Sequence, residues 1–372
     1  MKGLKNIISI LFLIIYFIFL ISLLVSYLSP YINPKNFWLF AFFGLAYPYL
    51  LLANIVFLIW WIIRWKKLYW LSLLCILIGW PNMKHFFHLS FDHDTSERKD
   101  EIKILSYNIR LFDLYNWTHQ KNTRNKIFSF LEDESADILC LQEFFQSDNG
   151  PFKMLDTLSN ITKSKDHHVE YTLTRRKDHW GMATFSKYPI INKGKITFKT
   201  TSNNICIFSD LKIGNDTVRV YNVHFQSISF GNADYKFMDV LKEKNDTLDA
   251  EDIEIASKNI LRRLKRAFVK RAGQTDKVLE HIGSCSYPVI VCGDFNDTPF
   301  SYTYHSFNEK LQDAFMENGS GIGSTYLGSF PSYRIDYIFH SDNFMASGFD
   351  IAPTELSDHY PLISRLKLIS SK

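Results

Sequence analysis

Two long runs of uncharged, apolar residues near the start of the chain constrain its fold more than any other feature. Ile7–Leu28 is 22 residues long, and a helix of that length rises about 33 Å, enough to cross the hydrocarbon core of a bilayer. Phe37–Ile63 is a second uncharged run, with tryptophans near its ends as at membrane interfaces. Leu68–Met83 is a third and shorter run, which fits either a short span or a helix lying in the interface. We therefore expect two to three transmembrane helices, near 7–28, 37–63 and 68–83.

The alternative for residues 1–28 is a cleaved signal peptide, because Lys2 and Lys5 give the segment a charged start. Its apolar region is too long for a signal peptide, however, and no small-x-small cleavage motif follows it. The second apolar run, which begins soon afterwards, also favours an anchor. Residues 1–90 are therefore predicted to form an integral, multi-pass membrane anchor.

The distribution of lysine and arginine predicts how this anchor is oriented. Basic residues precede the first run and follow the second: Lys2, Lys5, Arg64, Lys66 and Lys67. The loop between them, residues 29–36, contains only Lys35. The positive-inside rule then places the N-terminus and residues 64–67 in the cytoplasm. The remainder of the chain lies on the non-cytoplasmic side, the expected location of the catalytic domain, if Leu68–Met83 crosses the membrane, and in the cytoplasm if it does not.

The composition changes after His88. Residues 91–101 are predicted to be a polar linker, and residues 102–372 are enough for one large domain with a well-buried core. Two helix-like runs, Asn122–Glu132 and Ile260–His281, alternate with strand-like runs. The strand-like runs are Lys103–Tyr107, Ile138–Leu141, Met182–Ser186, Ile205–Ile213, Thr217–Val223, Val289–Cys292 and Ile335–His340.

The net charge and the cysteine content narrow the possible classes of protein only slightly. The formal net charge of +4 is small for 372 residues and does not by itself indicate a nucleic-acid-binding protein. The five cysteines form no CxxC pair, so they are interpreted as mostly buried thiols and not as a disulfide framework or a zinc site.

One predicted helix is strongly basic. Arg262–Arg271 carries six basic residues and no acidic one. Leu261, Leu264 and Phe268 fall at helical spacing, so that one face can pack against the domain. A solvated outer face is the favoured interpretation, and a surface for an anion, either lipid or nucleic acid, is the alternative.

Polar side chains gather where strand-like runs end. Five segments share this pattern: Ser106–Arg110, Leu141–Glu143, Asn222–His224, Gly293–Asp297 and Ser357–Pro361. A sixth segment, Arg334–Tyr337, places an acid at the start of a strand. Strand ends that face one edge of a sheet can direct their side chains into a single pocket.

The residue types in these segments suit a hard cation and a phosphate group. Mg²⁺ prefers one or two carboxylates and keeps several waters, and Glu143 is the best single candidate ligand. Asn108 can add a carbonyl oxygen or hold Glu143 in place. His359 can pair with an acid from another strand, for which Asp336 is an obvious candidate, and such a carboxylate would orient the ring and favour the imidazolium form.

Each segment alone has a simpler explanation. Gly-Asp-Phe-Asn-Asp at 293–297 fits a turn, Ser-Asp-His at 357–359 fits a capped loop, and His224 fits a buried core histidine. Their joint occurrence, in order and at strand ends, favours a site for phosphoester hydrolysis. That reaction needs an activated water, charge neutralisation on the phosphoryl oxygens and stabilisation of the leaving group.

The ordered set resembles the endonuclease/exonuclease/phosphatase superfamily, from about Lys103 to Leu366. The resemblance implies a four-layered α/β sandwich, in which two packed β-sheets are flanked by helices. It also implies a Mg²⁺-dependent hydrolase of phosphodiester or phosphomonoester bonds, with Mn²⁺ as a substitute metal. Arg110 and His224 stand where apurinic endonucleases carry an acidic ligand and a tyrosine, which favours the branch that contains deoxyribonucleases and neutral sphingomyelinases.

The resemblance further implies roles for individual residues. The implied metal ligands are Glu143, Asn108 and Asp358. The implied catalytic residues are His224, Asp294, Asn296, Asp336 and His359. Arg110 and Asn296 are expected to contact the phosphate. His359 is assigned as general base on this interpretation, although the sequence leaves open which histidine acts as acid and which as base.

Three functions remain for the whole chain. The first is a hydrolase acting at the membrane on a phosphoester such as a lipid head group, which the anchor favours. The second is an extracytoplasmic nuclease on DNA or RNA, with the same residues. The third is a non-catalytic membrane binding protein on the same scaffold, which ranks last because none of the expected ligands is missing. No segment indicates an obligate protein partner.

Overall fold

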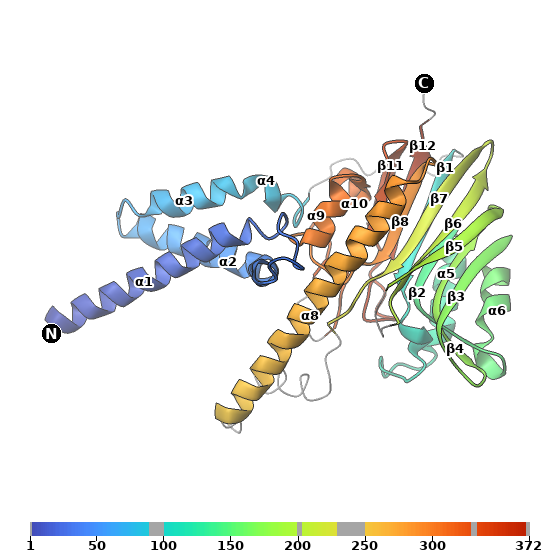
Figure 1. Cartoon of the computed structure of the whole chain (residues 1–372), viewed down its shortest axis with the longest axis horizontal. Helices are drawn as coiled ribbons and strands as arrows, with labels where there is room; N and C mark the ends of the chain where they lie inside the picture. Colours follow the sequence, from blue (N-terminus) through green and yellow to red (C-terminus); the bar gives the residue numbers. More distant parts are fainter. Residues whose placement is uncertain (1, 89–99, 199–202, 229–249, 329–332, 370–372) are drawn as a thin grey trace.

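The computed structural model describes residues 2–88, 100–198, 203–228, 250–328 and 333–369 (Figure 1). A helical part, the N-terminal bundle (residues 2–88), projects from a body built on two β-sheets, the sandwich (residues 101–369). The predicted linker lies mostly outside the described residues, and the first strand begins at Glu101.

The N-terminal bundle contains the three predicted apolar segments. Its helices are α1 (Lys2–Ser26), α2 (Leu39–Ile63), α3 (Tyr69–Ile78) and α4 (Trp80–Met83). Within the described residues, α1 and α2 are long and apolar enough to cross a membrane. The third predicted segment is divided at Gly79, and Pro81 sits in the first turn of α4, where its missing N–H costs nothing.

Some polar side chains inside the bundle form hydrogen bonds between its helices. The Tyr16 hydroxyl donates to the Leu68 carbonyl at 3.1 Å and lies 3.1 Å from the Ser72 hydroxyl. The Asn54 amide donates to the Phe19 carbonyl at 3.1 Å and to the Leu50 carbonyl at 2.8 Å. Such contacts connect the helices where apolar surface alone would not distinguish a neighbouring helix from lipid.

The sandwich consists of two six-stranded sheets with the same plan. The strands of the first, in spatial order, are β11 (Phe344–Ile351), β12 (Leu362–Leu368), β1 (Glu101–Asn108), β2 (Ile138–Ser147), β4 (Asp178–Ser186) and β3 (Asp166–Arg175). Those of the second are β5 (Ile190–Thr197), β6 (Ile205–Ile213), β7 (Asp216–His224), β8 (Val289–Asp294), β10 (Asp336–His340) and β9 (Gln312–Asp313). Each sheet has one parallel pair near its centre, β1 with β2 and β7 with β8, and the other pairs are antiparallel.

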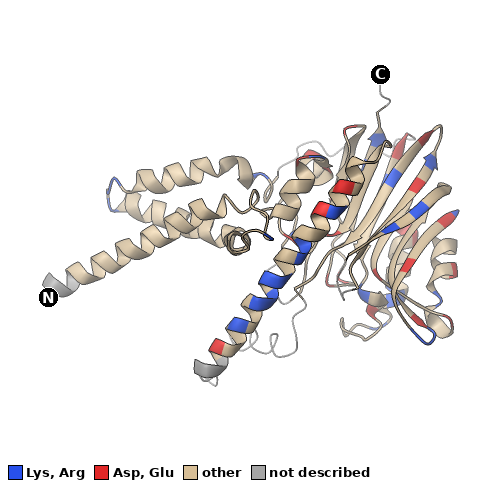
Figure 2. Cartoon of the chain, viewed as in Figure 1, with Lys and Arg blue, Asp and Glu red and all other residues tan. Residues whose placement is uncertain are grey.

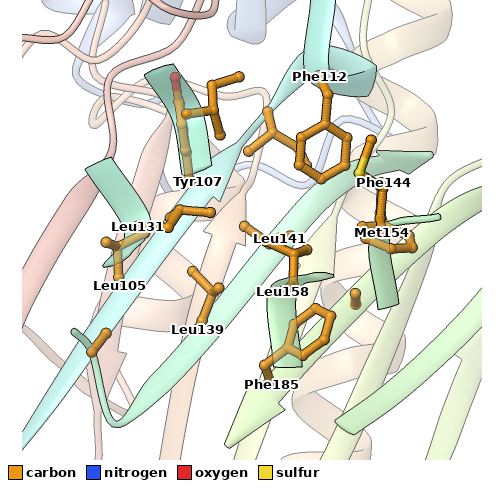
Figure 3. Packing of buried hydrophobic residues seen from close by; sticks show 14 of the residues in the cluster. Leu105, Tyr107, Phe112, Leu131, Leu139, Leu141, Phe144, Met154, Leu158 and Phe185 are labelled. Carbon is orange, nitrogen blue, oxygen red and sulfur yellow. The ribbon is translucent and has the colours of Figure 1, made fainter. Parts of the chain in front are cut away.

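Alternate residues of the central strands face opposite layers, as the two-residue period of a strand requires. In β2, Ile138 and Cys140 point between the sheets, whereas Leu139 and Leu141 point to the outer helices. Figure 3 shows this outer packing, in which Leu131 and Leu158 cover the first sheet.

Helices cover the outer face of each sheet. The first sheet is covered by α5 (Thr123–Glu134) and α6 (Met154–Ile161), and the second by α8 (Ala250–Gly283) and α9 (Tyr302–Asn308). Three short helices complete the described body: η1 (Arg110–Asp113), η2 (Gly150–Phe152) and α10 (Ala314–Asn318). The order helix, sheet, sheet, helix confirms the predicted four-layered α/β sandwich.

Five strands and the first ten residues of one helix were not predicted from the sequence. The missed strands are β3, β5, β9, β11 and β12. Strand β5, for example, is an edge strand whose residues are mostly exposed, so no apolar alternation marks it. Helix α8 begins ten residues before the predicted Ile260, because Ile253 and Ile255 are spaced two apart and both exposed, unlike a packed helical stripe.

The N-terminal bundle packs on the sandwich by the end that holds the α1–α2 loop. The Phe300 ring, 1 % exposed, stacks on Tyr47 with ring centroids 3.9 Å apart and planes at 7°. In the loop, Lys35 Nζ lies 2.7 Å from Asp276 Oδ2 of α8. The turn between α2 and α3 lies at the opposite end, so α3 and α4 run back towards the sandwich (Figure 1).

Candidate active site

The two parallel pairs bring the predicted polar residues to one edge of the sandwich. Asn108 ends β1, and in the second sheet His224 ends β7 directly beside Asp294 at the end of β8. Because β10 runs antiparallel to β8, its first residue, Asp336, pairs with Asp294. The predicted convergence of strand ends is therefore present.

One predicted placement is wrong. The Ser357–Asp358–His359 segment does not end a strand but precedes β12. It still reaches the site, because β12 is antiparallel to β1 and begins where β1 ends. The Ser357 hydroxyl donates to the Asn108 carbonyl at 2.8 Å and fixes this turn to the strand end.

Glu143 also departs from the predicted placement, since β2 continues past it to Ser147. The pairing of β2 with β4 shifts register between Leu141 and Phe144, and Glu143 has a φ of 49°. A bulge of this kind redirects one side chain without ending the strand. The unfavourable left-handed backbone thus turns the Glu143 carboxylate towards the site.

A buried aspartate–histidine pair lies at the centre. His359 Nδ1 is 2.9 Å from Asp336 Oδ2, the partner that the sequence indicates, and both residues are buried. His359 Nε2 faces a second carboxylate, with Asp294 Oδ2 at 3.9 Å. Burial alone would lower the pKa of His359, but the charges of Asp336 and Asp294 outweigh it and hold that pKa well above its usual value.

Asp294 is the residue on which the site converges. Burial raises the pKa of its carboxyl to about 6, although the nearby histidines oppose the shift. Its Oδ2 accepts from Asn108 Nδ2 at 3.0 Å and from Asn296 Nδ2 at 2.9 Å, and its Oδ1 accepts from the Asn296 backbone N–H at 2.8 Å. These donors fix the orientation of the carboxylate. Asn296 itself has a φ of 54°, which folds its side chain back onto Asp294.

His224 approaches Asp294 from the end of β7. Its Nε2 lies 3.7 Å from Asp294 Oδ2 and 3.8 Å from Glu143 Oε1, too far for hydrogen bonds. Within the described part of the chain, this buried nitrogen has no hydrogen-bond partner. Burial lowers the pKa of His224 and favours the neutral ring. A buried ring nitrogen without a partner that faces two carboxylates is suited to contact a ligand between them.

The predicted metal ligands form a second group beside Asn108. Asn108 Nδ2 lies 3.5 Å from Glu143 Oε1, and its Oδ1 accepts from the Arg110 backbone N–H at 3.2 Å. Burial, followed by the charge of Asp358, raises the pKa of Glu143. Two carboxylates that destabilise each other in this way are stabilised by a cation, so the donor set fits a divalent metal such as Mg²⁺. The Asn108 amide nitrogen thus lies between Asp294 and Glu143 and is closer to Asp294.

A further set of possible ligand atoms overlaps the catalytic group. The members of this set are the buried residues Asp294, Asp336 and His359. Each offers one possible ligand atom, and the three atoms lie within 4.8 Å of one another. These atoms already pair among themselves and with Asn296. Glu143 and Asp358, with oxygen donors alone, match the preference of Mg²⁺ more closely.

Arg110 forms one wall of a cleft beside the site. Its Nε lies 3.3 Å from Asp358 Oδ2, and its guanidinium lies 4.6 Å from the centre of the Trp117 ring. The cleft has a volume of about 670 Å³ and shares Ser357 and Asp358 with the site, while Tyr326 and Glu355 line its other parts. The predicted phosphate-contacting arginine is therefore held between an acid and an aromatic ring at the entrance.

Several residues that support the site were not assigned roles from the sequence. Gln142 Nε2 donates to Asn222 Oδ1 at 2.7 Å, and Asn222 Nδ2 donates to the Ala183 carbonyl at 3.0 Å. Both residues are fully buried and connect the two sheets directly behind Glu143 and His224. Each of them is a polar residue inside an apolar strand, and this signal in the sequence could have indicated a buried polar contact. Thr325 gave no such signal, although its hydroxyl accepts from the backbone N–H of Asp336 at 3.2 Å.

Two contacts hold the 293–297 segment. Gly293 has a φ of 140°, and a Cβ at this position would lie 2.1 Å from the Val223 carbonyl oxygen, so only glycine allows β7 and β8 to approach. At the other end, the fully buried Arg271 of α8 pairs with Asp297, with Nε 3.1 Å from Oδ2. The predicted basic helix thus contributes one of its charges to the support of the site.

Comparisons with known proteins agree with this geometry. Residues 105–359 match the family described as "Endonuclease/Exonuclease/phosphatase family", and residues 9–86 match a domain of unknown function (DUF8431). No curated protein matches the chain.

Solved structures show the same fold. An endonuclease/exonuclease/phosphatase from Beutenbergia cavernae is 14 % identical with a TM-score of 0.52, covering 73 % of this chain and 72 % of that one. The catalytic domain of human Nocturnin with a bound sulfate anion is 17 % identical with a TM-score of 0.50, covering 73 % and 94 %. A family protein from Bacteroides thetaiotaomicron is 17 % identical with a TM-score of 0.50, covering 73 % and 96 %. Since the family match spans more than half of the sequence, the chain belongs to the endonuclease/exonuclease/phosphatase family.

Proposed function

We propose that this protein is a membrane-anchored, divalent-metal-dependent hydrolase of phosphodiester or phosphomonoester bonds. The observation that carries the proposal is the convergence of two histidines on the buried Asp294. One of them, His359, lies between two carboxylates and the other, His224, has a buried nitrogen directed at the same point. This arrangement offers a fixed acid and a fixed base around a space suited to a phosphoryl group.

The contacts of His359 distinguish its catalytic role from that of Asp294. His359 Nδ1 donates to Asp336, and its Nε2 faces the Asp294 carboxylate, so a ring with protons on both nitrogens is favoured. An imidazolium stabilises negative charge on a phosphoryl oxygen and donates a proton, but it does not accept one. We therefore assign the base to Asp294, which orients the attacking water and takes its proton, in place of the His359 base expected from the sequence.

The other residues position the substrate. His224 Nε2 contacts a second phosphoryl oxygen or the leaving oxygen, and Asn296 holds Asp294 in the required orientation. Glu143, Asn108 and Asp358 are the residues that would hold a divalent cation, which compensates the charge developing on the phosphate when it is bound. Arg110, at the entrance of the cleft, contacts the part of the substrate beyond the scissile bond.

The N-terminal bundle supports the membrane part of the proposal. In the apolar stretches of α1 and α2, only 17 % and 22 % of residues are buried, whereas the core helix of a soluble protein is mostly buried. The sandwich packs against the α1–α2 loop, and α3 with α4 returns from the 64–68 turn to the same side. With residues 64–67 in the cytoplasm, the positive-inside rule places the sandwich on the non-cytoplasmic side. We accordingly treat residues 1–90 as the anchor, 91–101 as the linker and 102–372 as the catalytic domain.

The test uses the full chain in detergent or nanodiscs, with Mg²⁺ or with EDTA. The substrates are bis-p-nitrophenyl phosphate, p-nitrophenyl phosphate, phospholipid vesicles, and DNA and RNA. We expect metal-dependent hydrolysis of at least one of them that is lost in Glu143→Gln and in His359→Gln. His179→Gln is the matched control and should retain full activity, because this partly buried histidine of β4 pairs with Asp148 and with none of the candidate site residues.

The outcome of this test also distinguishes the lipid hydrolase, the nuclease and the non-catalytic binding protein from one another. Release of a lipid head group supports a membrane phospholipase-type activity, whereas cleavage restricted to DNA or RNA supports the nuclease alternative. No hydrolysis of any substrate, or activity that survives both site substitutions, contradicts the proposal and favours a non-catalytic binding protein.

A further inference from the structure

Helix α8 carries a dense cluster of positive charge. Between Ile253 and Arg271 the chain has seven basic residues and one acidic residue, and Figure 2 shows the basic residues following one another along the helix. In the part of the chain that the structure describes, Arg271 pairs with Asp297 beside the site, and Lys258 pairs with Glu254 one turn away on α8 itself. Support of the site therefore explains only one of these charges, and the basic residues on the outer part of α8 need another explanation.

The C-terminal half of α8 is firmly fixed to the sandwich. Val278, Leu279 and Ile282 are buried in the core that covers the second sheet. Arg271 adds its ion pair with Asp297. The direction of the helix is consequently set by the sandwich, and its N-terminal half projects from a rigid base (Figure 1).

The middle of α8 touches the start of α2. Lys265 Nζ lies 4.3 Å from the centre of the Trp38 ring, and the Phe268 and Phe42 rings meet edge to face at 5.2 Å. Trp38 immediately precedes α2, which begins at Leu39. If α2 crosses a membrane, its first residues mark the surface of that membrane, and tryptophan is typical of this level. Lys265 then lies at the depth of the lipid head groups.

From Lys265, the helix continues towards Ala250 for about 22 Å at 1.5 Å per residue, leaving the sandwich beside the N-terminal bundle (Figure 1). Three exposed apolar side chains lie on this stretch, Ile253 at 40 %, Ile255 at 53 % and Leu261 at 52 % exposure. Exposed cations, Arg262 and Arg266, lie beside them. Among the described residues, neither arginine is paired with a carboxylate.

Like charges act on one another at the inner end of the basic cluster. Lys270 lies one turn from Arg266, and burial together with the charge of Arg266 lowers the pKa of Lys270. Anions from outside the chain would relieve this repulsion. A mixture of exposed isoleucine and leucine with arginine and lysine is the composition of helices that lie in a membrane interface, where the apolar side chains enter the bilayer and the cations meet the head groups.

We propose that the outer half of α8, residues 253–266, lies on the membrane surface and binds anionic lipid head groups. Lipid is favoured over nucleic acid because apolar residues share the exposed surface with the cations and because Lys265 contacts Trp38 at the level where α2 begins. Each basic residue at an anionic surface strengthens binding by about fivefold. Since the same helix holds Asp297, the lipid contact also fixes how the sandwich is oriented over the bilayer.

The test measures where α8 lies and does not depend on hydrolysis, so its failure is distinct from failure of the proposed activity. A spin label is attached to Leu261→Cys in the full chain, with Cys285→Ser, because the other four cysteines are buried. The protein is placed in nanodiscs of phosphatidylcholine, with or without roughly 30 % phosphatidylglycerol. A nickel-chelating lipid in the discs broadens the spectrum of any label at head-group depth.

We expect broadening at position 261 that increases with anionic lipid and weakens at about 0.5 M salt, where charges are screened within a few ångströms. Arg262→Gln with Arg266→Gln should reduce the lipid-bound population by about 25-fold. The charge-preserving pair Arg262→Lys and Arg266→Lys should retain it. A label at Ile191→Cys, exposed on β5 of the sandwich, provides the negative control.

Two results would overturn the proposal. One is a label at 261 that remains equally remote from lipid in both kinds of disc, or whose contact is the same in the Gln and Lys variants. The other is that single-stranded DNA, added to discs without anionic lipid, binds the wild-type chain and not the Gln variant, while anionic lipid has no effect. That pattern would identify α8 as a nucleic-acid surface.

Discussion

The Asp336–His359 pair gives the sharpest prediction about the site. Asp336→Asn keeps the size of the side chain but removes the charge that favours a proton on both nitrogens of His359. The pair is buried, and its hydrogen bond is 2.9 Å long. A hydrogen bond to a charged group contributes about 1.5–3 kcal/mol, and each 1.36 kcal/mol is tenfold in rate. We therefore expect kcat/KM to fall by about 10- to 150-fold, with KM changed much less than kcat.

A double-mutant cycle distinguishes this role from a structural one. If Asp336 acts only through His359, then Asp336→Asn should add little further loss once His359→Gln is present, because groups that act as a unit are not additive. The assay is hydrolysis of the substrate identified by the panel, with the metal at saturation. Asp336→Glu should recover part of the rate, since it restores the charge.

Two observations would refute this reasoning. Asp336→Asn could retain its rate within about threefold, which is less than the smallest effect expected from the loss of a charged hydrogen bond. Alternatively, the two substitutions could reduce the rate additively, which would show that Asp336 acts on the reaction by a path other than His359.

Three further predictions concern stability. Gly293→Ala should destabilise the sandwich by more than about 1–3 kcal/mol, because the new Cβ strains the backbone and clashes with the Val223 carbonyl. Gly214→Ala is the control in thermal unfolding and should cost less stability, since no atom lies within 4 Å of its new Cβ. Gln142→Met should lower the free energy of unfolding by about 1–3 kcal/mol, because it leaves the Asn222 side-chain Oδ1 unpaired. The double variant with Asn222→Leu should lose less than the sum of the two single variants, and additive losses in denaturant titrations would contradict a coupled pair. Burial, followed by the charges of Lys84 and Arg334, lowers the pKa of His85 to about 4, so its contribution is present above about pH 6.5 and is lost as pH falls towards 4. Unfolding of wild type compared with His85→Gln at pH 7 and pH 5 checks the sign, and an equal loss in both proteins would exclude His85.

The sequence determined the residue types of the site because the chemistry depends on them directly. Asn108, His224 and Asp294 end buried strands, and parallel neighbours bring such ends to one edge of a sheet. The sequence also showed that α1 and α2 are long and apolar, because a helix that crosses a bilayer needs a minimum number of consecutive apolar residues. The four-layered sandwich followed from the resemblance carried by these same motifs.

Only the tertiary structure decided how these parts meet. Glu143 reaches the site through a bulge, and His359 through a strand that runs in the opposite direction to the one expected. The pairing of Gln142 with Asn222 joins residues 80 positions apart, and no local pattern encodes such a contact. The division of the third apolar segment into α3 and α4 was likewise not evident from its length.

The basic helix shows the same division. Its sequence established an amphipathic segment with an excess of positive charge, because helical spacing and charge are local properties. Whether those charges face solvent, the site or the membrane depends on what packs beside the helix. The structure places Arg271 on Asp297 and Lys265 on Trp38. Side-chain chemistry was thus fixed by the order of residues, whereas its direction was fixed by contacts between segments distant in the chain.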